Sequence, residues 1–471
     1  MEILHVSAEC YPVAKAGGLG DVVGALPKYQ NQLGHTAKVV MPMYRTKFLY
    51  ENEFEVVHKG GFFMGPTWYD FTIIKEKTNR LEFDLYLVDI YGLLDREAVY
   101  GYNDDAERFT AFQIAVVEWV ASWQHQPDVV HVHDHHTGLI PFMLKHCYPY
   151  KHLSNISTVL TIHNAQYQGS MDWSKSIYLP EWNTWEWGKL DWQNSINPLA
   201  SAVKCADRVT TVSWSYLNEM RESANGLENL FEYERGKCIG ILNGIDDAVW
   251  DPATDPYLDH HFGIDDAIAG KQENKMVLCN QFGLDIGKPL FIFIGRLVHE
   301  KAADLLPQVI YDSIQHMQGR MNFLILGSGD PATEWALENM KYPLTGYYNS
   351  RIGYNEKLSH QMYAGADFLL MPSRVEPCGL NQMYAMRYGT IPIVRNTGGL
   401  KDTVIDIGDD GGYGIKFNNA SVWDITYSIH RAIELYEKKS RIHEIRTALM
   451  ELDNSWVSSA GQYIQLYQSL I

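Results

Sequence analysis

The sequence lacks the features of membrane proteins and of secreted, disulfide-bonded proteins. It contains no run of about 18 uncharged apolar residues, the length that a membrane-spanning helix needs. Met1 leads directly into an apolar segment, without the basic stretch and the cleavage site of a signal peptide. Only six cysteines occur, and they are scattered without a C-x-x-C pair. We therefore expect a cytoplasmic protein without a membrane partner.

Positive charge is also scarce. The chain carries 39 Lys and Arg against 57 Asp and Glu, which gives a formal net charge of −18. Such an acidic chain is unsuited to nucleic acid, and any phosphate that it binds must meet a local group of cations. No G-x-x-x-x-G-K-[ST] run is present, which excludes the P-loop NTPases. Gly327-Ser-Gly329 lacks the third glycine of a dinucleotide fingerprint, so a dehydrogenase is weakly supported.

What the sequence does contain is a long alternation of strand-like and helix-like segments. A chain of 471 residues exceeds one ordinary core, and the alternation occurs twice, on either side of a turn-rich acidic stretch at 243–255. Strict alternation predicts parallel sheets covered by helices, so we expect an α/β protein with two doubly wound, Rossmann-like domains facing a cleft. Aromatic and polar residues that alternate over 54–88 predict additional antiparallel strands. We expect domains at 1–245 and 246–456, and a C-terminal helix at 457–471 that crosses back to the first.

The glycine-rich stretch Lys15-Ala-Gly-Gly-Leu-Gly-Asp21 follows the first predicted strand, which spans residues 1–7. Its glycines leave backbone N–H groups uncovered, and we expect Asp21 to cap a helix that begins at Val22. A strand, a glycine-rich loop and a helix N-terminus together favour bound phosphate. A tight turn with a solvated lysine is the alternative reading.

Four histidines lie in the run His131-Val-His-Asp-His-His136, at the end of a predicted buried strand. Their number suggests a metal site, yet no second ligand cluster accompanies them, so we predict no metal. Ligand-facing residues at the carboxyl end of a parallel strand are the favoured interpretation. His163 ends the next strand-like run in the same way, with a core histidine bonded to backbone as the alternative.

Tryptophans gather in one segment whose spacing fits no helix face, which predicts a loop with short helical pieces. Exposed tryptophans stack on sugar rings, and clustered ones also pack on each other, so both interpretations stay open. The five in this segment are Trp173, Trp182, Trp185, Trp187 and Trp192.

Three polar clusters at predicted strand-to-helix junctions suit a diphosphate and a sugar: 15–21, 296–301 and 376–380. At this point the chain resembles the family of bacterial glycogen synthases and plant starch synthases. The resemblance spans nearly the whole chain, in order. It is carried by the motif at 15–21, His-Asp-His-His-Thr-Gly at 133–138, Thr-Ile-His-Asn at 161–164, Ile-Leu-Asn-Gly-Ile-Asp at 241–246, Gly-Arg-Leu-x-x-x-Lys at 295–301, Glu-Pro-Cys-Gly-Leu at 376–380 and Thr-Gly-Gly-Leu at 397–400.

The resemblance implies the glycosyltransferase-B fold and transfer of glucose from ADP-glucose to the non-reducing end of an α-1,4-glucan, with retained configuration. It implies no cofactor and no metal, since Arg296 and Lys301 resemble the pair that neutralises the diphosphate. The residues that it marks as catalytic are Lys15, His163, Arg296, Lys301 and Glu376. Those that it marks as substrate-binding are Gly17, Gly18, Asp21, Asp134, Asn243, Tyr354, Cys378, Gly379, Leu380 and Asn381.

Several positions depart from the family pattern. Ala302 stands where glycine normally follows the lysine, Glu300 replaces a glutamine, and Asn381 replaces a common threonine. These departures keep two alternatives open: a retaining glucosyltransferase that uses UDP-glucose, and an inactive glucan-binding homologue. The oligomeric state is not specified by the sequence.

Overall fold

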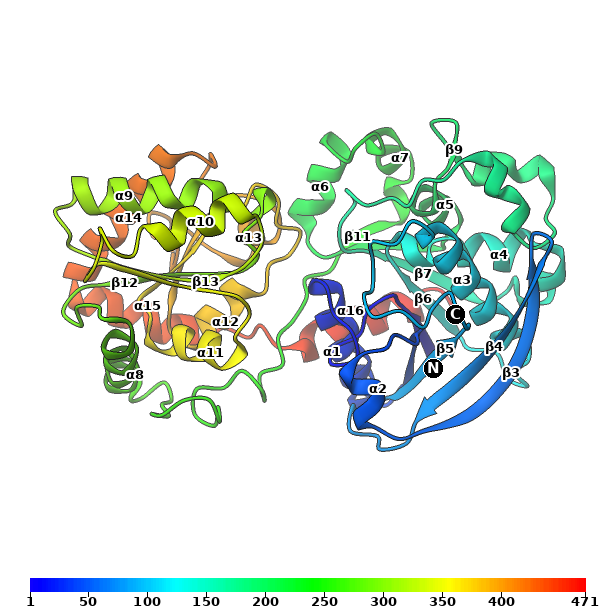
Figure 1. Ribbon diagram of the computed structural model, residues 1–471, viewed down its shortest axis with the longest axis horizontal. Coiled ribbons are helices and arrows are strands. Elements are labelled where there is room, and N and C mark those ends of the chain that lie inside the picture. Colours follow the sequence, from blue (N-terminus) through cyan, green and yellow to red (C-terminus); the bar gives the residue numbers. More distant parts are fainter. The chain divides into compact units, whose positions relative to one another are not determined.

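A computed structural model describes residues 1–471 in two compact units (Figure 1). The first unit comprises Met1–Asn243 together with Trp456–Ile471, and the second comprises Gly244–Ser455. The expected boundaries lay at 245/246 and 456/457. No helix combines the length and the apolar character that a membrane crossing requires.

The first unit is built on a nine-stranded sheet whose order is β11-β10-β7-β6-β1-β2-β5-β4-β3. The strands from β11 to β5 run parallel, whereas β4 pairs antiparallel with both β5 and β3, as the alternation over 54–88 predicts. In sheet order the bounds are Cys238–Gly240, Arg208–Thr211, Ser157–Ile162, Val129–His133, Glu2–Val6, Thr36–Pro42, Asp84–Asp89, Thr67–Glu76 and Phe54–Met64. A separate hairpin pairs β8 (Asp191–Trp192) with β9 (Ser195–Ile196).

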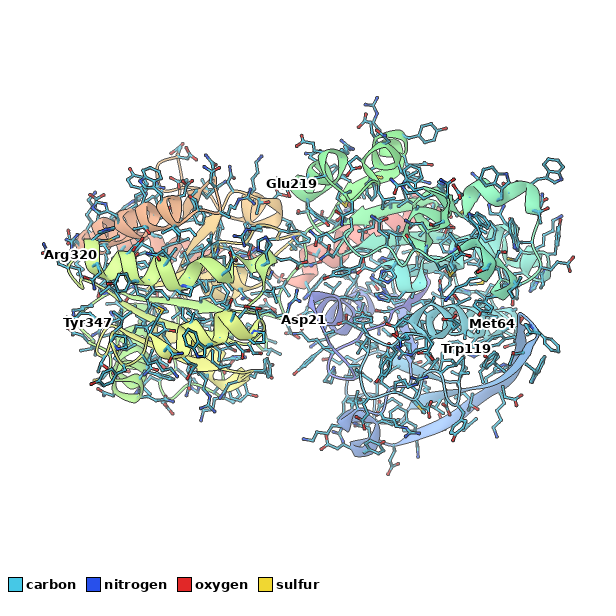
Figure 2. The ribbon with its side chains drawn as sticks, turned by 45° about the horizontal axis from the view of Figure 1, so that its top comes forward. Asp21, Met64, Trp119, Glu219, Arg320 and Tyr347 are labelled. Atoms are coloured by element: carbon cyan, nitrogen blue, oxygen red, sulfur yellow. The ribbon has the colours of Figure 1, made fainter.

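Helices of the first unit come mostly from the crossovers between its parallel strands. They are α1 (Gly18–Gln32), α2 (Lys47–Glu51), α3 (Asp105–Ala121), α4 (Ile140–His146), α5 (Pro198–Cys205), α6 (Trp214–Glu222), α7 (Glu228–Tyr233) and α16 (Trp456–Gln468). Short 3-10 turns are η1 (His135–Thr137), η2 (Tyr148–Leu153), η3 (Trp173–Tyr178), η4 (Thr184–Lys189) and η5 (Arg235–Lys237). Trp119 on α3 and Met64 on β3 mark neighbouring elements, because α3 packs on the added hairpin (Figure 2).

The C-terminal helix α16 packs on α1 within the first unit. Its apolar face joins a buried cluster with strands β1 and β7, and the cluster includes Trp456, Tyr463, Tyr467, Ile3, Val22, Leu26 and Val159. Burial of several large side chains at roughly 1.5–3 kcal/mol each makes this helix an integral part of the first core.

The second unit is a six-stranded, fully parallel sheet in the order β14-β13-β12-β15-β16-β17. The bounds in that order are Tyr348–Ile352, Asn322–Gly327, Leu290–Ile294, Phe368–Met371, Ile391–Arg395 and Ile415–Phe417. In Figure 1 α9, α10 and α14 lie over one face, and α8, α11, α12 and α15 lie over the other. The helices are α8 (Ala267–Phe282), α9 (Leu306–His316), α10 (Pro331–Asn339), α11 (Glu356–Gly365), α12 (Asn381–Arg387), α13 (Gly398–Thr403), α14 (Val422–Glu437) and α15 (Lys439–Glu451), with turns η6 (His299–Lys301) and η7 (Ala303–Leu305).

One local prediction is wrong. Asp21 does not cap a helix that begins at Val22, because α1 already begins at Gly18 with Gly17 as its N-cap. Asp21 lies in the first turn, as Figure 2 shows, where its negative charge interacts favourably with the helix dipole.

Candidate active site

The glycine-rich loop of the first unit is ordered by a carboxylate that sequence reasoning missed. One oxygen of Glu9, Oε2, accepts hydrogen bonds from the backbone N–H groups of Ala16 (2.7 Å) and Gly17 (2.9 Å). The other oxygen accepts the Tyr100 hydroxyl at 2.6 Å. One of the amides that we expected to face a phosphate, that of Gly17, is therefore already paired inside the protein, as is the neighbouring amide of Ala16.

Lys15 and Asp21 form an ion pair at 2.7 Å on the rim of this loop. The Lys15 side chain keeps 38% of its surface exposed, so its ammonium group is accessible from solvent. A β carbon added at Gly17 or Gly18 would meet no atom within 4 Å, which leaves open space above both residues. Lys15 and the two glycines therefore border a free surface of the first unit.

Asp134 and His163 lie beside each other at the carboxyl ends of β6 and β7. The Oδ1 atom of Asp134 accepts the backbone N–H of His163 at 2.7 Å. Asp134 has a φ of 56° and a ψ of −171°, a backbone conformation that is found almost only at glycine. Burial raises the pKa of Asp134 to about 7, although the N–H groups of His163 and Asn164 act in the opposite direction.

His163 itself is held neutral. Burial lowers the pKa of its imidazole to about 3, so the ring is uncharged at neutral pH. Its Nε2 atom lies 3.0 Å from Nδ1 of His133. This contact with a side chain excludes the alternative of a histidine bonded only to backbone. A neutral ring with one nitrogen engaged leaves the other available to a ligand.

Asn243 follows β11 at the end of the first unit and is buried. Its side-chain Oδ1 has no hydrogen-bond partner within the protein. A buried amide oxygen without a donor is costly, so this atom suits a hydroxyl group of a ligand.

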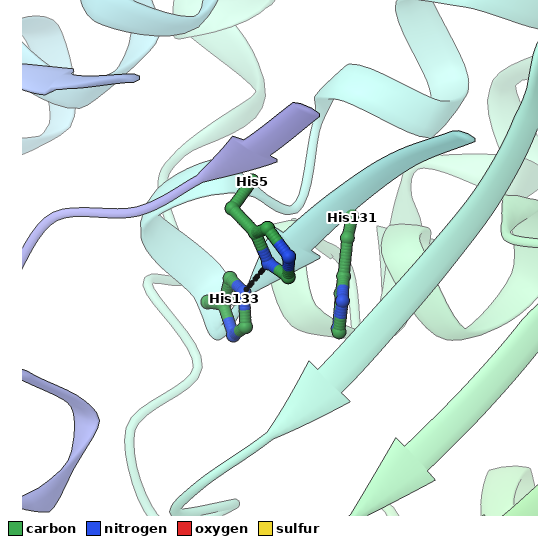
Figure 3. Close-up of side chains that lie close together, drawn as sticks. All are labelled: His5, His131 and His133. Atoms are coloured by element: carbon green, nitrogen blue, oxygen red, sulfur yellow. Dashed lines mark hydrogen bonds between the residues drawn. The ribbon is translucent and has the colours of Figure 1, made fainter. Parts of the chain in front are cut away.

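The histidine run separates into different environments. His131 and His133 are fully buried in the sheet, so the interpretation as ligand-facing residues is wrong for both. They lie beside His5 of β1, and nitrogen atoms of the three rings all lie within 4.8 Å of one another (Figure 3).

This trio could in principle hold a metal, but its nitrogens are already used. Each of the six ring nitrogens of His5, His131 and His133 has a hydrogen-bond partner among protein side chains. A cation at the centre would break several of these bonds and would find no carboxylate among the three ligands. The chemistry of the donor set therefore fits a hydrogen-bonded cluster better than a metal centre.

In the second unit the predicted site residues gather at the carboxyl ends of the parallel strands. Arg296 follows β12, Tyr354 follows β14, and Glu376 follows β15. Because neighbouring parallel strands end at the same edge of the sheet, the fold collects these side chains on one side of the unit.

Lys301 and Glu376 are the tightest pair at this edge. Lys301 Nζ lies 2.6 Å from Oε2 of Glu376, which also accepts the Ser373 hydroxyl at 2.8 Å. The Glu376 side chain is only 8% exposed. A buried carboxylate that is paired with a cation and accepts a second hydrogen bond is held in a fixed orientation.

Arg296 is more exposed and more loosely held. Its side chain is 56% exposed and makes one long ion pair, at 3.5 Å, with Glu300. This guanidinium can turn toward an anion at little cost, because few contacts must be broken.

Glycine pairs allow the loops at this edge to approach one another. A β carbon at Gly398 would lie 1.9 Å from the carbonyl oxygen of Glu376, and one at Gly399 would lie 2.0 Å from that of Cys378. Likewise, a β carbon at Gly327 would lie 2.0 Å from the carbonyl oxygen of Gly295. The Gly-Ser-Gly run thus serves close packing against the loop that carries Arg296.

The remaining predicted residues of the second unit have distinct surroundings. Tyr354 is 80% exposed, and its hydroxyl donates to Glu356 at 3.1 Å. Gly379 has a φ of 75°, which brings the chain into α12, and Leu380 is the N-cap of that helix. Asn381 donates to the carbonyl of Ile294 at 2.6 Å, so its side chain joins α12 to β12. Cys378 is buried.

Ala302 adopts a φ of 54°, directly after Lys301. Glycine takes this conformation at lower cost than alanine, which agrees with the glycine expected at this position. The turn also divides the segment into η6 and η7 before α9 begins at Leu306.

The tryptophan segment forms short 3-10 turns, as predicted. Trp185 is 90% exposed and Trp187 is 55% exposed, whereas Trp173 donates to Asp191 and Trp182 packs on Phe142. Trp185 and Trp192 contribute to a hollow of about 370 Å³ that Lys189, Lys204 and Tyr233 also line. The segment therefore contains tryptophans that pack within the protein as well as exposed ones, so both interpretations stay open.

Comparison with known proteins adds the family. Residues 2–233 match the family model "Starch synthase catalytic domain", and residues 278–446 match "Glycosyl transferases group 1". The chain is 53% identical to a glycogen synthase of Flavobacterium johnsoniae over all of this chain and 99% of that protein. It is also 38% identical to a glycogen synthase of Hydrogenobaculum sp., over all of this chain and 98% of that protein.

Solved structures agree with these matches. The catalytic domain of starch synthase IV from Arabidopsis thaliana, bound to ADP and acarbose, superposes with a TM-score of 0.90 and 32% identity, over 100% of this chain and 99% of that chain. A sucrose-phosphate synthase from Thermosynechococcus elongatus has a TM-score of 0.64 at 16% identity, over 99% of this chain and 98% of that chain, which is a likeness of fold alone.

Proposed function

The chain belongs to the family of bacterial glycogen synthases and plant starch synthases, and we propose that the polar residues of its two units serve one reaction. The fold is glycosyltransferase-B, and the enzyme is a retaining glycosyltransferase of the glycogen synthase type. The reaction transfers glucose from ADP-glucose to the non-reducing end of an α-1,4-glucan. The relative that binds ADP and acarbose, a nucleotide and an oligosaccharide analogue, supports this pair of substrates.

The second unit supplies the charges for the leaving group in this proposal. Arg296 is exposed and weakly paired, so it is free to bind the diphosphate. Lys301 lies against Glu376 and completes a cationic pair that stabilises the charge which develops as ADP departs. The two side chains act in place of a metal, and no cofactor is proposed.

The same edge of the sheet also orients the donor. The buried carboxylate of Glu376 accepts hydroxyl groups of the glucose, and its ion pair with Lys301 is the single observation that carries the proposal. The amides of Gly379 and Leu380 at the start of α12 face the phosphates, Cys378 and Asn381 shape the loop, and exposed Tyr354 stacks on the base.

The first unit contributes the groups that act on the sugar. Asp134 holds the backbone of His163, whose carbonyl and imidazole stabilise a cationic, oxocarbenium-like transition state. Lys15, Gly17 and Gly18 approach the phosphates from their open surface, with Asp21 as the partner of Lys15. Asn243 offers its unpaired amide oxygen to a hydroxyl.

The function is tested by incubating the purified protein with glycogen and either ADP-glucose or UDP-glucose. We expect chain extension with ADP-glucose and release of ADP, with the new linkage in the α configuration. If the glucan is extended with UDP-glucose and not with ADP-glucose, the donor in this proposal is wrong and UDP-glucose takes its place. Binding of glycogen without turnover of either donor would favour an inactive glucan-binding protein.

The role of the cationic pair is tested with Lys301→Ala. We expect kcat to fall at least about 100-fold, because removal of one preorganised charge contact has effects of this size. Lys341→Ala is the matched control, since Lys341 also pairs with a glutamate, Glu338 at 2.6 Å, on the surface of the same unit. Equal rates for the two variants would contradict the assignment of Lys301.

A further inference from the structure

A chain of buried hydrogen bonds leads from His163 into the core of the first unit. His163 Nε2 contacts His133 Nδ1 at 3.0 Å, His133 Nε2 contacts His5 Nδ1 at 3.1 Å, and His5 Nε2 contacts Gln30 Oε1 at 2.7 Å. The middle bond, between His133 and His5, is drawn in Figure 3. His5, Gln30 and His133 are fully buried, so water does not compete for these atoms.

The chain continues through the C-terminal helix. Gln30 Nε2 donates to the Tyr467 hydroxyl at 3.2 Å, and that hydroxyl lies 2.6 Å from His131 Nδ1. Beyond it, His131 Nε2 lies 2.6 Å from the Thr161 hydroxyl, which lies 2.6 Å from that of Thr210. The Thr210 hydroxyl donates to the carbonyl oxygen of Leu160.

Two groups in this chain of hydrogen bonds, the Gln30 amide and the Leu160 carbonyl, have fixed donor and acceptor atoms, and both require the same direction of donation along the chain. The amide oxygen of Gln30 can only accept, so His5 must carry its proton on Nε2. Burial lowers the pKa of His5 to about 4 and depresses the pKa of His133 and His163 as well, so the three rings are neutral. A neutral ring that donates from Nε2 accepts at Nδ1, and the same polarity passes from His5 to His133 and on to His163. At the far end, the Leu160 carbonyl is again an acceptor only.

We propose that this chain of hydrogen bonds fixes His163 as the Nε2–H tautomer and orients its ring, which makes His133, His5 and Gln30 positioning residues for the glucosyl transfer. The inference rests on the role of His163 in the proposed function. It assigns the trio in Figure 3 to this task instead of to a metal. It also fixes the polarity of His163 toward a substrate, because a bare Nδ1 can accept a hydrogen bond from a sugar hydroxyl and cannot donate one.

The first test needs no substitution in the chain of bonds. The full-length protein is labelled with 15N in its histidine rings, and the ring nitrogen chemical shifts distinguish N–H from bare nitrogen. The signal of His163 is assigned as the one that disappears in His163→Gln. We expect protonated Nε2 and bare Nδ1 for His163, His133 and His5 at neutral pH. Protonated Nδ1 on His163 would overturn the proposal.

The second test removes the acceptor that sets the polarity. Gln30→Met keeps the length of the side chain and removes both its donor and its acceptor. We expect His163 to populate both tautomers and kcat to fall about tenfold, the lower end of the effects seen when a partner that orients a metal-bound histidine is removed. KM for ADP-glucose should change little, since Gln30 touches no substrate.

Gln32→Met is the matched control. Gln32 lies on the same helix α1, and its amide donates to exposed Glu82 at 3.3 Å, outside the chain of bonds. It should keep both the His163 tautomer and kcat. An unchanged tautomer in Gln30→Met would overturn the proposal, whatever happens to the rate.

Failure of this inference and failure of the proposed function give different results. If His163→Ala retains full turnover, the role of His163 in the reaction is wrong, while the tautomer measurement still tests the chain of bonds. If His163→Ala loses turnover and Gln30→Met changes neither tautomer nor kcat, only the positioning role is wrong.

Discussion

Glu9 is one buried side chain that determines the form of a functional loop. Its carboxylate accepts two backbone N–H groups of that loop and the Tyr100 hydroxyl, and only 3% of its surface is exposed. Without it, the amides of exposed Ala16 and half-buried Gly17 would lose their acceptor within the protein. The residue therefore contributes to stability and to the position of Lys15 at once.

Replacement of Glu9 separates these contributions. We expect Glu9→Ala to lower the free energy of unfolding by about 1–3 kcal/mol, because hydrogen bonds that contribute about 0.5–1.5 kcal/mol each are lost, and to reduce turnover. Glu9→Gln should be milder in both respects, because its amide oxygen still accepts the two N–H groups and its NH₂ group can donate to the Tyr100 oxygen. Urea unfolding and initial rates with ADP-glucose measure the two effects. Equal losses of stability and turnover in Glu9→Ala and Glu9→Gln would show that the negative charge of Glu9 matters more than the positions of its hydrogen-bonding atoms.

Lys15 should behave in the opposite way, with a large effect on activity and a small one on stability. Its ion pair with Asp21 is exposed, and such pairs contribute about 0–1 kcal/mol. We expect Lys15→Ala to lower kcat/KM for ADP-glucose at least about tenfold, as the loss of a phosphate contact would. Lys28→Ala, which breaks the ion pair between Lys28 on α1 and Glu82, should leave turnover unchanged. Unchanged turnover in Lys15→Ala would refute its assignment.

At the scale of elements, strands β1 and β6 bring histidines together in the middle of a sheet. His5, His131 and His133 are fully buried, and burial depresses the pKa of each. The sheet tolerates them because every ring nitrogen is hydrogen-bonded. Burial of these histidines makes the fold sensitive to acid, because the unfolded chain binds protons that the buried rings of the folded protein do not.

This sensitivity predicts the pH dependence of stability for the first unit. For His5, the folded pKa of about 4 lies below the ordinary value of 6.5, so stability falls as the pH drops from about 6.5 to about 4. The slope is roughly 1.4 kcal/mol per pH unit for each such histidine. Asp134 acts in the opposite direction, because its raised pKa of about 7 makes the folded state bind a proton there, and it offsets about one histidine.

Denaturant unfolding between pH 7 and pH 5 measures this slope. His5→Gln removes one titrating group and should make the slope shallower by about that amount, even if the variant is less stable at pH 7. A slope that does not respond to His5→Gln would mean that the histidine is protonated in the folded protein.

At the scale of the whole molecule, each of the two units has its own sheet and its own buried core. The chain passes from one unit to the other twice, near residues 243 and 455. Separate cores make separate unfolding transitions the natural expectation, and a ligand should stabilise the unit that binds it.

Calorimetry with ADP tests this expectation. At 100 times its Kd, a ligand adds about 2.7 kcal/mol to the stability of the state that binds it. We expect ADP to raise the transition of the second unit, which supplies most of the proposed contacts to the nucleotide, by more than that of the first unit, whereas acid should lower mainly the first. The Arg296→Ala variant should lose most of the shift. A shift confined to the first unit would contradict the assignment of the nucleotide to the second.

Much of this protein could be predicted from the order of its residues. The alternation of strands and helices indicates two parallel sheets, because helix and strand periods are local properties of the sequence. The motifs at Lys15, Arg296 and Glu376 indicate the family, because each places particular residue types at fixed short spacings after a strand. The structural match to starch synthase confirms the fold that these patterns predict.

Only the tertiary structure decided which polar groups meet across long stretches of sequence. His5 and His133 are 128 residues apart, and His131 and Tyr467 are 336 apart, yet each pair shares a hydrogen bond. The same holds for Glu9, whose carboxylate reaches a tyrosine 91 residues away. Local pattern determined which segments become strands and where reactive residues follow them. Sheet order and burial determined that His131 and His133 lie inside the sheet, because a buried polar group takes whichever partner the fold places beside it.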